Sequence, residues 1–178
     1  MKRVLFVIVF GLAGTAVLLF LGKWQLDRLA WKQAILHEID SKIVAQPVDI
    51  PQQPTILNDR YLPVQAKGQL YPTTIRVLVS RKRIGAGYRL ISAFETDGRK
   101  VLLDRGFIKV AAPLPPFIEK DVSVLGNLHW PDEIDSYTPQ PDMEKNIWFA
   151  RDVEALSKEL GTLPILIVAS NVLPSEKA

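Results

Sequence analysis

The sequence predicts a membrane-anchored, mainly β protein of the α+β class: an N-terminal transmembrane helix, then an antiparallel β sandwich or partly open barrel with one short helix. Three patterns predict this fold. Residues 4–21 carry no charge, residues 23–42 contain neither proline nor glycine, and alternating apolar positions begin near residue 60. We expect four regions: a transmembrane anchor at 1–22, a juxtamembrane helical stalk at 23–45, a Pro-rich linker at 46–55 and a β-rich extracytoplasmic domain at 56–178.

The N-terminal apolar run is long enough to cross a bilayer. Its 18 residues, 4 to 21 inclusive, would form a helix of roughly 27 Å, close to the ~30 Å hydrocarbon core. A cleaved signal peptide is the alternative, because Lys2 and Arg3 precede the run and Gly14-Thr15-Ala16 resembles a cleavage site. Cleavage sites normally follow the apolar segment, however, and residues 17–21 are still apolar. The prediction is therefore an uncleaved anchor.

Charge and composition exclude several classes of function. The chain has 178 residues with 22 Lys+Arg against 19 Asp+Glu, and without Lys2 and Arg3 the balance is 20 to 19. So small an excess, with no sustained basic stripe, predicts no nucleic-acid partner. The chain has no cysteine, which excludes disulfides, thiolate catalysis and cysteine-ligated metals. The about 150 residues beyond the anchor are enough for one domain with a hydrophobic core.

Period-two patterns and turn residues divide the remainder into strands. Asp97-Gly98 predicts a tight hairpin, Gly126 predicts a β-bulge, and an early proline suggests that the first strand lies at an edge. One helix is expected to begin after the N-cap Asp152 and to end at Gly161. The expected strands are 60–70, 74–80, 88–95, 100–110, a fifth around 122–130, and short ones at 146–150 and 164–169.

No pattern of side chains predicts catalysis or a metal centre. His37 and His129 each lack a companion at ligand spacing, so a structural role is expected for both. Gly85-Ala86-Gly87 lacks the third glycine of a dinucleotide-binding loop. The basic residues 81–83 form an ordinary exposed turn, or else a contact for lipid headgroups or an acidic partner. A solvated acidic loop is expected at Asp132, Glu133, Asp135 and Asp142.

Several motifs follow one another along the chain. They are Gly22-x-Trp24-Gln25-x-x-Arg28-x-x-Trp31-Lys32, Tyr61 with Gly68, Gly87-Tyr88, Val101-Leu102-Leu103-Asp104-Arg105-Gly106-Phe107, and Asn146-Ile147-Trp148-Phe149-Ala150-Arg151-Asp152. In this order, over roughly residues 4–170, they resemble the surfeit locus protein 1 family, the assembly factors of haem–copper cytochrome c oxidase. The resemblance implies a chaperone-like factor and not an enzyme, held in an inner membrane with its β-rich domain facing the periplasm or intermembrane space.

The resemblance also implies partners and a cofactor. The partners would be the lipid bilayer and oxidase subunit I or its assembly intermediates, and the cofactor would be haem a, which bacterial members carry or present. The sequence shows no mitochondrial transit segment before Val4, which favours the bacterial inner (plasma) membrane with the main domain facing the periplasm. The histidine segment to which family haem binding is ascribed does not occur in this chain. The alternative is a membrane-tethered binding module that docks a membrane protein complex with no haem role.

The candidate cofactor-binding residues are Trp24, Gln25, Arg28, Trp31 and Arg105. Spacings of three or four residues place Trp24, Arg28 and Trp31 together on a helix. A guanidinium between indoles makes cation–π contacts and can also meet a carboxylate such as a haem propionate. Ordinary interfacial anchoring explains the same tryptophans, and pairing with a neighbouring acid such as Asp104 explains Arg105. An anchored hydrolase fits poorly, because histidine is scarce and cysteine absent.

Overall fold

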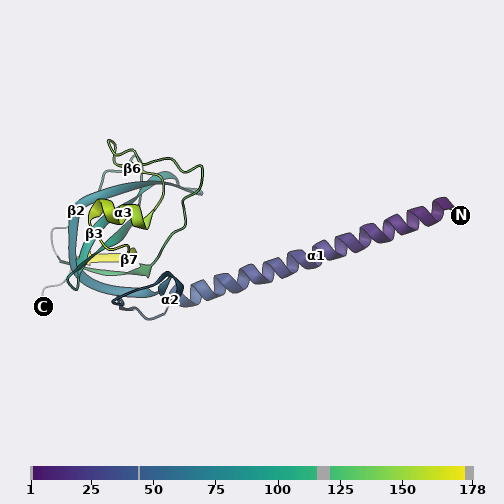
Figure 1. Cartoon of the computed structure of the whole chain (residues 1–178), viewed down its shortest axis with the longest axis horizontal. Helices are drawn as coiled ribbons and strands as arrows, with labels where there is room; N and C mark the ends of the chain where they lie inside the picture. Colours follow the sequence, from purple (N-terminus) through teal and green to yellow (C-terminus); the bar gives the residue numbers. More distant parts are fainter. Residues whose placement is uncertain (1, 44, 116–120, 175–178) are drawn as a thin grey trace. The chain divides into compact units, whose positions relative to one another are not determined.

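The computed structural model describes residues 2–43, 45–115 and 121–174, with side chains up to 36 in the first segment and up to 173 in the last. The chain forms two compact units, Met1–Ser41 and Lys42–Ala178. Helix α1, Lys2–Ile43, accounts for the first unit as one unbroken helix (Figure 1). The predicted anchor and stalk are therefore continuous in secondary structure. The segment Lys2–Leu36 is long and apolar enough to cross a membrane, and its side chains are exposed.

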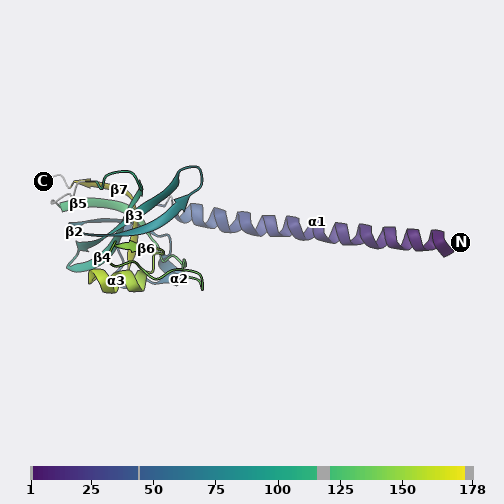
Figure 2. The same cartoon turned by 90° about the horizontal axis from the view of Figure 1, so that it is seen from above.

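The second unit is a mixed β-sheet that closes on itself. Strands β2, β3, β4, β7 and β5 pair in that order, and β5 pairs back to β2, which makes a partly closed ring (Figure 2). The predicted partly open barrel is confirmed, and the structure adds parallel pairings of β1 with β2, β6 with β2 and β4 with β7. The strands are β1 Val48–Asp49, β2 Pro63–Arg81, β3 Gly85–Thr96, β4 Arg99–Lys109, β5 Asp121–Leu128, β6 Ile147–Trp148 and β7 Leu166–Pro174.

Strand β2 corrects two of the sequence predictions. The strands expected at 60–70 and 74–80 are one strand, with an irregular register between Leu70 and Thr74. The predicted edge position is wrong, because Val64 pairs with Val48 on one side and with Gly126 on the other. The proline signal misled because Pro63 is the first residue of the strand, a position where an absent N–H costs little pairing.

The segment predicted as a Pro-rich linker is bound to the sheet. It contributes β1, and Ile50 is buried. The guanidinium of Arg99 donates hydrogen bonds to the carbonyl oxygens of Ile50 at 2.8 Å, Pro51 at 2.9 Å and Gln52 at 2.8 Å. A single helical turn that the sequence did not predict, α2 (Ile56–Asp59), follows it with Thr55 as N-cap.

Several local predictions are confirmed. Asp97 and Gly98 have φ of 50° and 71°, as a two-residue hairpin with both central residues left-handed requires. The register between β5 and β7 shifts next to Gly126, as expected for a bulge. Helix α3, Val153–Leu160, begins where the Asp152 carboxylate accepts a hydrogen bond from the Ala155 N–H at 3.1 Å. It ends at Gly161, whose φ is 63°.

Two apolar clusters sit on opposite faces of the ring strands. All five ring strands contribute buried side chains to the first, which includes Phe94, Leu103 and Ile167. The second includes Leu102 and packs beneath α3. Neighbours such as Leu102 and Leu103 point to opposite faces because strand side chains alternate. The inside of the ring is thus filled by side chains, as in other small barrels.

Candidate functional site

A buried carboxylate, that of Asp104 on β4, is the centre of the most polar cluster in the described core. The side chain is fully buried, and it binds Nε of Arg89 on β3 and, at 3.4 Å, Nη1 of Arg151 just before α3. Arg151 in turn binds Glu133, with its Nε 3.1 and 3.2 Å from the two carboxylate oxygens. We refer to Arg89, Asp104, Arg151 and Glu133 as the Asp104 network.

The electrostatics of the Asp104 network keep its charges in place. Burial opposes ionisation of Glu133, but hydrogen bonds from the Arg151 side chain and backbone outweigh it and lower the pKa of that carboxyl. Burial likewise opposes the charge of Arg151, yet Glu133 and Asp104 together raise its pKa above the ordinary value. A buried ion pair adds little net stability, but removing one partner is costly because the other charge stays desolvated. The network therefore fixes the positions of α3 and of the loop around Glu133 (the 133 loop) against β3 and β4.

A β-bulge in β4 produces this arrangement. The register between β3 and β4 shifts between Arg89 and Ile91, because Ile91 pairs with Asp104 whereas Arg89 pairs with Phe107. Gly106 supplies the bulge with φ of 107°, a backbone conformation that L side chains rarely adopt. Its N–H donates to the Asp104 carboxylate at 3.0 Å. The bulge therefore holds the carboxylate in place between the two arginines.

Arg105 does not pair with its neighbour Asp104. The Asp104 carboxylate is taken by Arg89 and Arg151, so pairing with Asp104 does not explain Arg105. Arg105 is half-buried, and desolvation lowers its pKa.

His129 lies beside the Asp104 network and is uncharged at neutral pH. Its ring stacks on Tyr61 with 5.1 Å between ring centroids. Burial lowers its pKa from 6.5 to about 4, and the nearby charges of Arg151 and Arg60 add to the effect. Among the described residues no cluster of three or more His, Cys, Asp or Glu side chains is arranged to hold a metal ion. The side chain of the other histidine, His37, lies outside the described residues.

The His129 shift predicts a pH dependence of stability. The unfolded chain takes up the proton near pH 6.5 and the folded chain only near pH 4, so the unfolded state binds more protons between these values. Stability should be complete above pH 6.5 and fall as the pH drops through this window. In His129→Phe, which keeps a ring against Tyr61, this part of the pH dependence should vanish in thermal unfolding scans. An unchanged slope between pH 6.5 and 4 in the variant would contradict the assignment.

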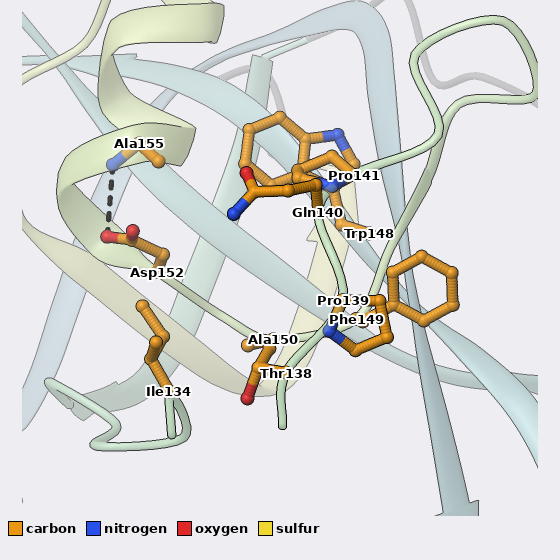
Figure 3. Close-up of a pocket in the computed structure, with 10 residues that line it drawn as sticks. All are labelled: Ile134, Thr138, Pro139, Gln140, Pro141, Trp148, Phe149, Ala150, Asp152 and Ala155. Carbon is orange, nitrogen blue, oxygen red and sulfur yellow. Dashed lines mark hydrogen bonds between the residues drawn. The ribbon is translucent and has the colours of Figure 1, made fainter. Parts of the chain in front are cut away.

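A pocket lies between the 134–141 loop, the residues after β6 and the start of α3 (Figure 3). Its volume is about 230 Å³, below the usual range of roughly 300–1,000 Å³ for ligand sites. Asp152, at one side, is engaged by Ala155 as the helix cap. The lining residues are Ile134, Thr138, Pro139, Gln140, Pro141, Trp148, Phe149, Ala150, Asp152 and Ala155.

Haem a does not fit these surroundings. A second hollow of about 700 Å³ is lined by polar and apolar groups in similar measure, with Asp49, Lys67 and Ser123 among the polar ones. Neither hollow has a histidine in its lining, and imidazole is a common axial ligand of haem iron. Neither of these two hollows therefore offers the imidazole that would hold haem iron.

The sequence-predicted cofactor candidates fall in two separate units. Trp24, Gln25, Arg28 and Trp31 lie on α1, where the Arg28 guanidinium sits 5.5 Å from the Trp24 ring centroid. Trp24 and Trp31 are 45% and 62% exposed. Arg105 lies on β4 in the other unit. The structure thus brings Trp24 and Arg28 together, and a cofactor role for any of the five remains a prediction.

The sequence motifs that contain Gly68, Gly87 and Asp104 mark two kinds of position. At the glycines the fold leaves no space for a side chain, and at Asp104 it buries a charge. A Cβ on Gly68 would lie 1.9 Å from the Glu95 carbonyl oxygen, and one on Gly87 would lie 2.2 Å from that of Ile108. Asp104 sits at the end of the apolar residues 101–103. That charge inside a buried strand was the available signal for the network. Its partners Arg89 and Glu133 carried no comparable signal, because they are distant in sequence.

Comparison with known proteins identifies the relatives. The chain is 31% identical to surfeit locus protein 1 of Homo sapiens over 84% of this chain and 58% of that protein. A SURF1-like protein of Rickettsia bellii is 26% identical over 82% of this chain and 62% of its own. The cytochrome oxidase assembly protein SHY1 of Saccharomyces cerevisiae is 28% identical over 82% of this chain and 42% of its own.

The chain spans a little over half the length of the mammalian relatives that it matches. The yeast relative is named for assembly and not for a catalysed reaction, in agreement with the prediction that the chain is not an enzyme. The SURF1 family model matches residues 12–177, which include most of the apolar run, the whole ring and α3. The sequence resemblance is therefore confirmed, and the chain belongs to the SURF1 family.

Proposed function

We propose that this chain is an assembly factor for haem–copper cytochrome c oxidase that acts on subunit I at the stage when haem a is inserted. The observation that carries the proposal is the family match over residues 12–177, together with a relative named as a cytochrome oxidase assembly protein. The chain is proposed to act by binding and positioning a client, as the name of the yeast relative as an assembly protein suggests.

The chain is proposed to sit in the bacterial inner membrane with its β unit facing the periplasm. The uncharged run 4–21 and the length of α1 support membrane anchoring. Trp24, just after the run, is suited to the membrane interface, where an indole buries its ring and keeps its N–H wet. A bacterial relative of similar coverage supports the location.

The first segment beyond the apolar run is the proposed docking surface for subunit I. Trp24, Arg28 and Trp31 are exposed there, and tryptophan and arginine are the residues most enriched among energetically dominant interface positions. The Arg28 guanidinium, stacked near Trp24, keeps donors available for a carboxylate. This surface serves equally the second candidate function, a tethered module that docks the oxidase without a haem role.

Deletion and complementation test the proposal. Loss of the gene should lower oxidase content and haem a absorbance while unrelated respiratory complexes stay normal. Normal, fully haemylated oxidase in the deletion strain would refute the proposal. Purified protein that lacks haem absorbance yet co-purifies with oxidase subunits would favour the module without a haem role.

The docking surface makes its own prediction. Trp24→Ala/Arg28→Ala should weaken docking of subunit I roughly 30-fold, as expected when an interface loses ~2 kcal/mol. Co-purification of subunit I with the tagged chain measures the loss. Leu26→Ala/Gln33→Ala, on the opposite face of the same helix and also exposed, is the matched control and should behave as wild type. Equal recovery of subunit I with both double variants would contradict the assignment of this surface.

A further inference from the structure

Strands β2, β3 and β4 extend beyond the ring as a three-stranded sheet. Ring pairing of β2 with β5 ends at Gln69, and pairing of β4 with β7 is confined to residues 102–104. Past these points β3 continues between its two neighbours down to the turn at Arg81–Gly85 (Figure 2). We call residues 78–89 and 105–115 the distal sheet. It includes the residues that directly follow β4.

The distal sheet is strongly cationic. It contains no acidic residue. Arg81, Lys82, Arg83 and Lys109 are exposed and Arg105 is half-buried, and no ion pair involves these five within the part of the chain that the structure describes. The sixth cation, Arg89, is taken up by Asp104. An unbalanced positive surface of this density attracts anions.

Aliphatic side chains are exposed among these cations. Ile84 at the turn is 47% exposed, and Val110 after β4 is 51% exposed. The Val110 N–H donates to the Ala86 carbonyl oxygen at 3.4 Å. This hydrogen bond joins the residues after β4 to the start of β3. Apolar residues interspersed with Lys and Arg are typical of surfaces that insert shallowly into a bilayer interface.

The turn itself carries a cation at an unfavourable backbone position. Arg83 has φ of 71°, a left-handed conformation that glycine would adopt without strain. The sequence thus has an arginine where the backbone alone would suit glycine. A site that accepts such strain deserves a functional explanation.

We propose that the distal sheet binds anionic lipid headgroups at the surface of the bilayer, with Ile84 and Val110 entering the interface and the arginines and lysines pairing with phosphate. The inference rests on the membrane anchoring proposed above. Anchoring tethers the β unit to the bilayer through α1, which continues for 22 residues beyond Leu21, so lipid is present at a high effective concentration. A lipid surface matches both the charge and the exposed aliphatic residues, whereas an acidic protein would account for the charge alone.

The test uses the full chain, whose lack of cysteine permits a single fluorescent label at Ile84→Cys. The labelled protein is reconstituted in vesicles of phosphatidylcholine, with or without phosphatidylglycerol, that carry a headgroup-attached quencher. Quenching should be strong with phosphatidylglycerol and weak without it, and should decrease with salt. Lys82→Glu/Arg83→Glu should lower the equilibrium constant for surface binding at least roughly 25-fold, since each lost cation weakens attraction to an anionic leaflet about fivefold.

Matched controls separate the explanations. Lys67→Glu/Lys158→Glu makes the same change in net charge at exposed positions elsewhere and should leave quenching unchanged, and a label at Leu163→Cys, 44% exposed, should stay unquenched. A label at Val9→Cys reports insertion of α1 independently.

An inserted α1 with an unquenched Ile84 label would overturn the lipid assignment alone. An Ile84 label shielded only when oxidase subunits are added would also overturn it, in favour of an acidic protein surface. A Val9 label left in water would overturn the anchoring, and this inference with it.

Discussion

Replacing Asp104 by asparagine should lower the free energy of unfolding of the β unit by about 3–5 kcal/mol, the usual cost of leaving buried charges without their partner. The change removes the only carboxylate contacted by Arg89 among the described residues, and one of two contacted by Arg151. Both guanidiniums are deeply placed, with side chains 14% and 13% exposed. Urea unfolding of the full chain in detergent, followed by tryptophan fluorescence, measures the loss.

Asp132→Asn is the matched control for Asp104→Asn. Asp132 is exposed and makes no side-chain hydrogen bond or ion pair within the described residues, so its replacement should change the free energy of unfolding by less than about 0.5 kcal/mol. If Asp104→Asn does not fold, Glu133→Gln still tests the network from its outer end. It should lower the free energy of unfolding by about 1 kcal/mol, as for a partly exposed ion pair. A variant at Asp104 within 1 kcal/mol of wild type would show that the network does not position these elements.

Gly68→Ala should destabilise the β unit by about 3 kcal/mol or more, at the upper end of the range for overpacked sites. The added methyl would lie 1.9 Å from the carbonyl oxygen and 2.9 Å from the carbonyl carbon of Glu95. Both are backbone atoms, so the strands must separate to relieve the clash. The separation would also strain the hydrogen bond that the Thr96 hydroxyl donates to the Lys67 carbonyl oxygen at 2.9 Å. Thermal unfolding and the yield of folded protein measure the effect.

Gly22→Ala is the control for the glycine substitution. Its added methyl would meet nothing within 4 Å, and alanine is the better helix former, so the β unit should unfold as in wild type. Equal stability of the Gly68→Ala and Gly22→Ala variants would contradict the close approach of β2 to β3 at this point.

The sequence predicted the elements whose signals are local. The turn at Asp97-Gly98 was predictable because its type requires two positive φ values, and Asp and Gly adopt these more readily than most residues. Asp152 and Gly161 bound α3 for equally local reasons, a side-chain cap and a left-handed backbone. The predicted end of a strand at residue 70 is wrong. The prolines at the start of this strand and within 70–74 favoured an interruption. Pairing with β5 and β3 overrides them.

The candidate site shows the same division. The contact between Trp24 and Arg28 of α1 was predicted from their spacing, because helix geometry fixes which neighbours meet. The Asp104 network was not predicted, since its members come from β3, β4, the 133 loop and the residue before α3, at separations of 15 to 47 residues. Sequence spacing carries no information on such contacts.

The sequence by itself determined an apolar run able to cross a membrane, the alternation of a β-rich unit, the caps of α3 and membership of the SURF1 family through ordered motifs. Only the tertiary structure decided that β5 returns to β2 to close the ring, that β4 and β7 run parallel, and that the distal sheet carries unbalanced positive charge. The physical reason is range. Propensity, capping and hydropathy act over one or two turns of chain, whereas strand pairing and the burial of Asp104 between two arginines depend on residues that only folding brings together.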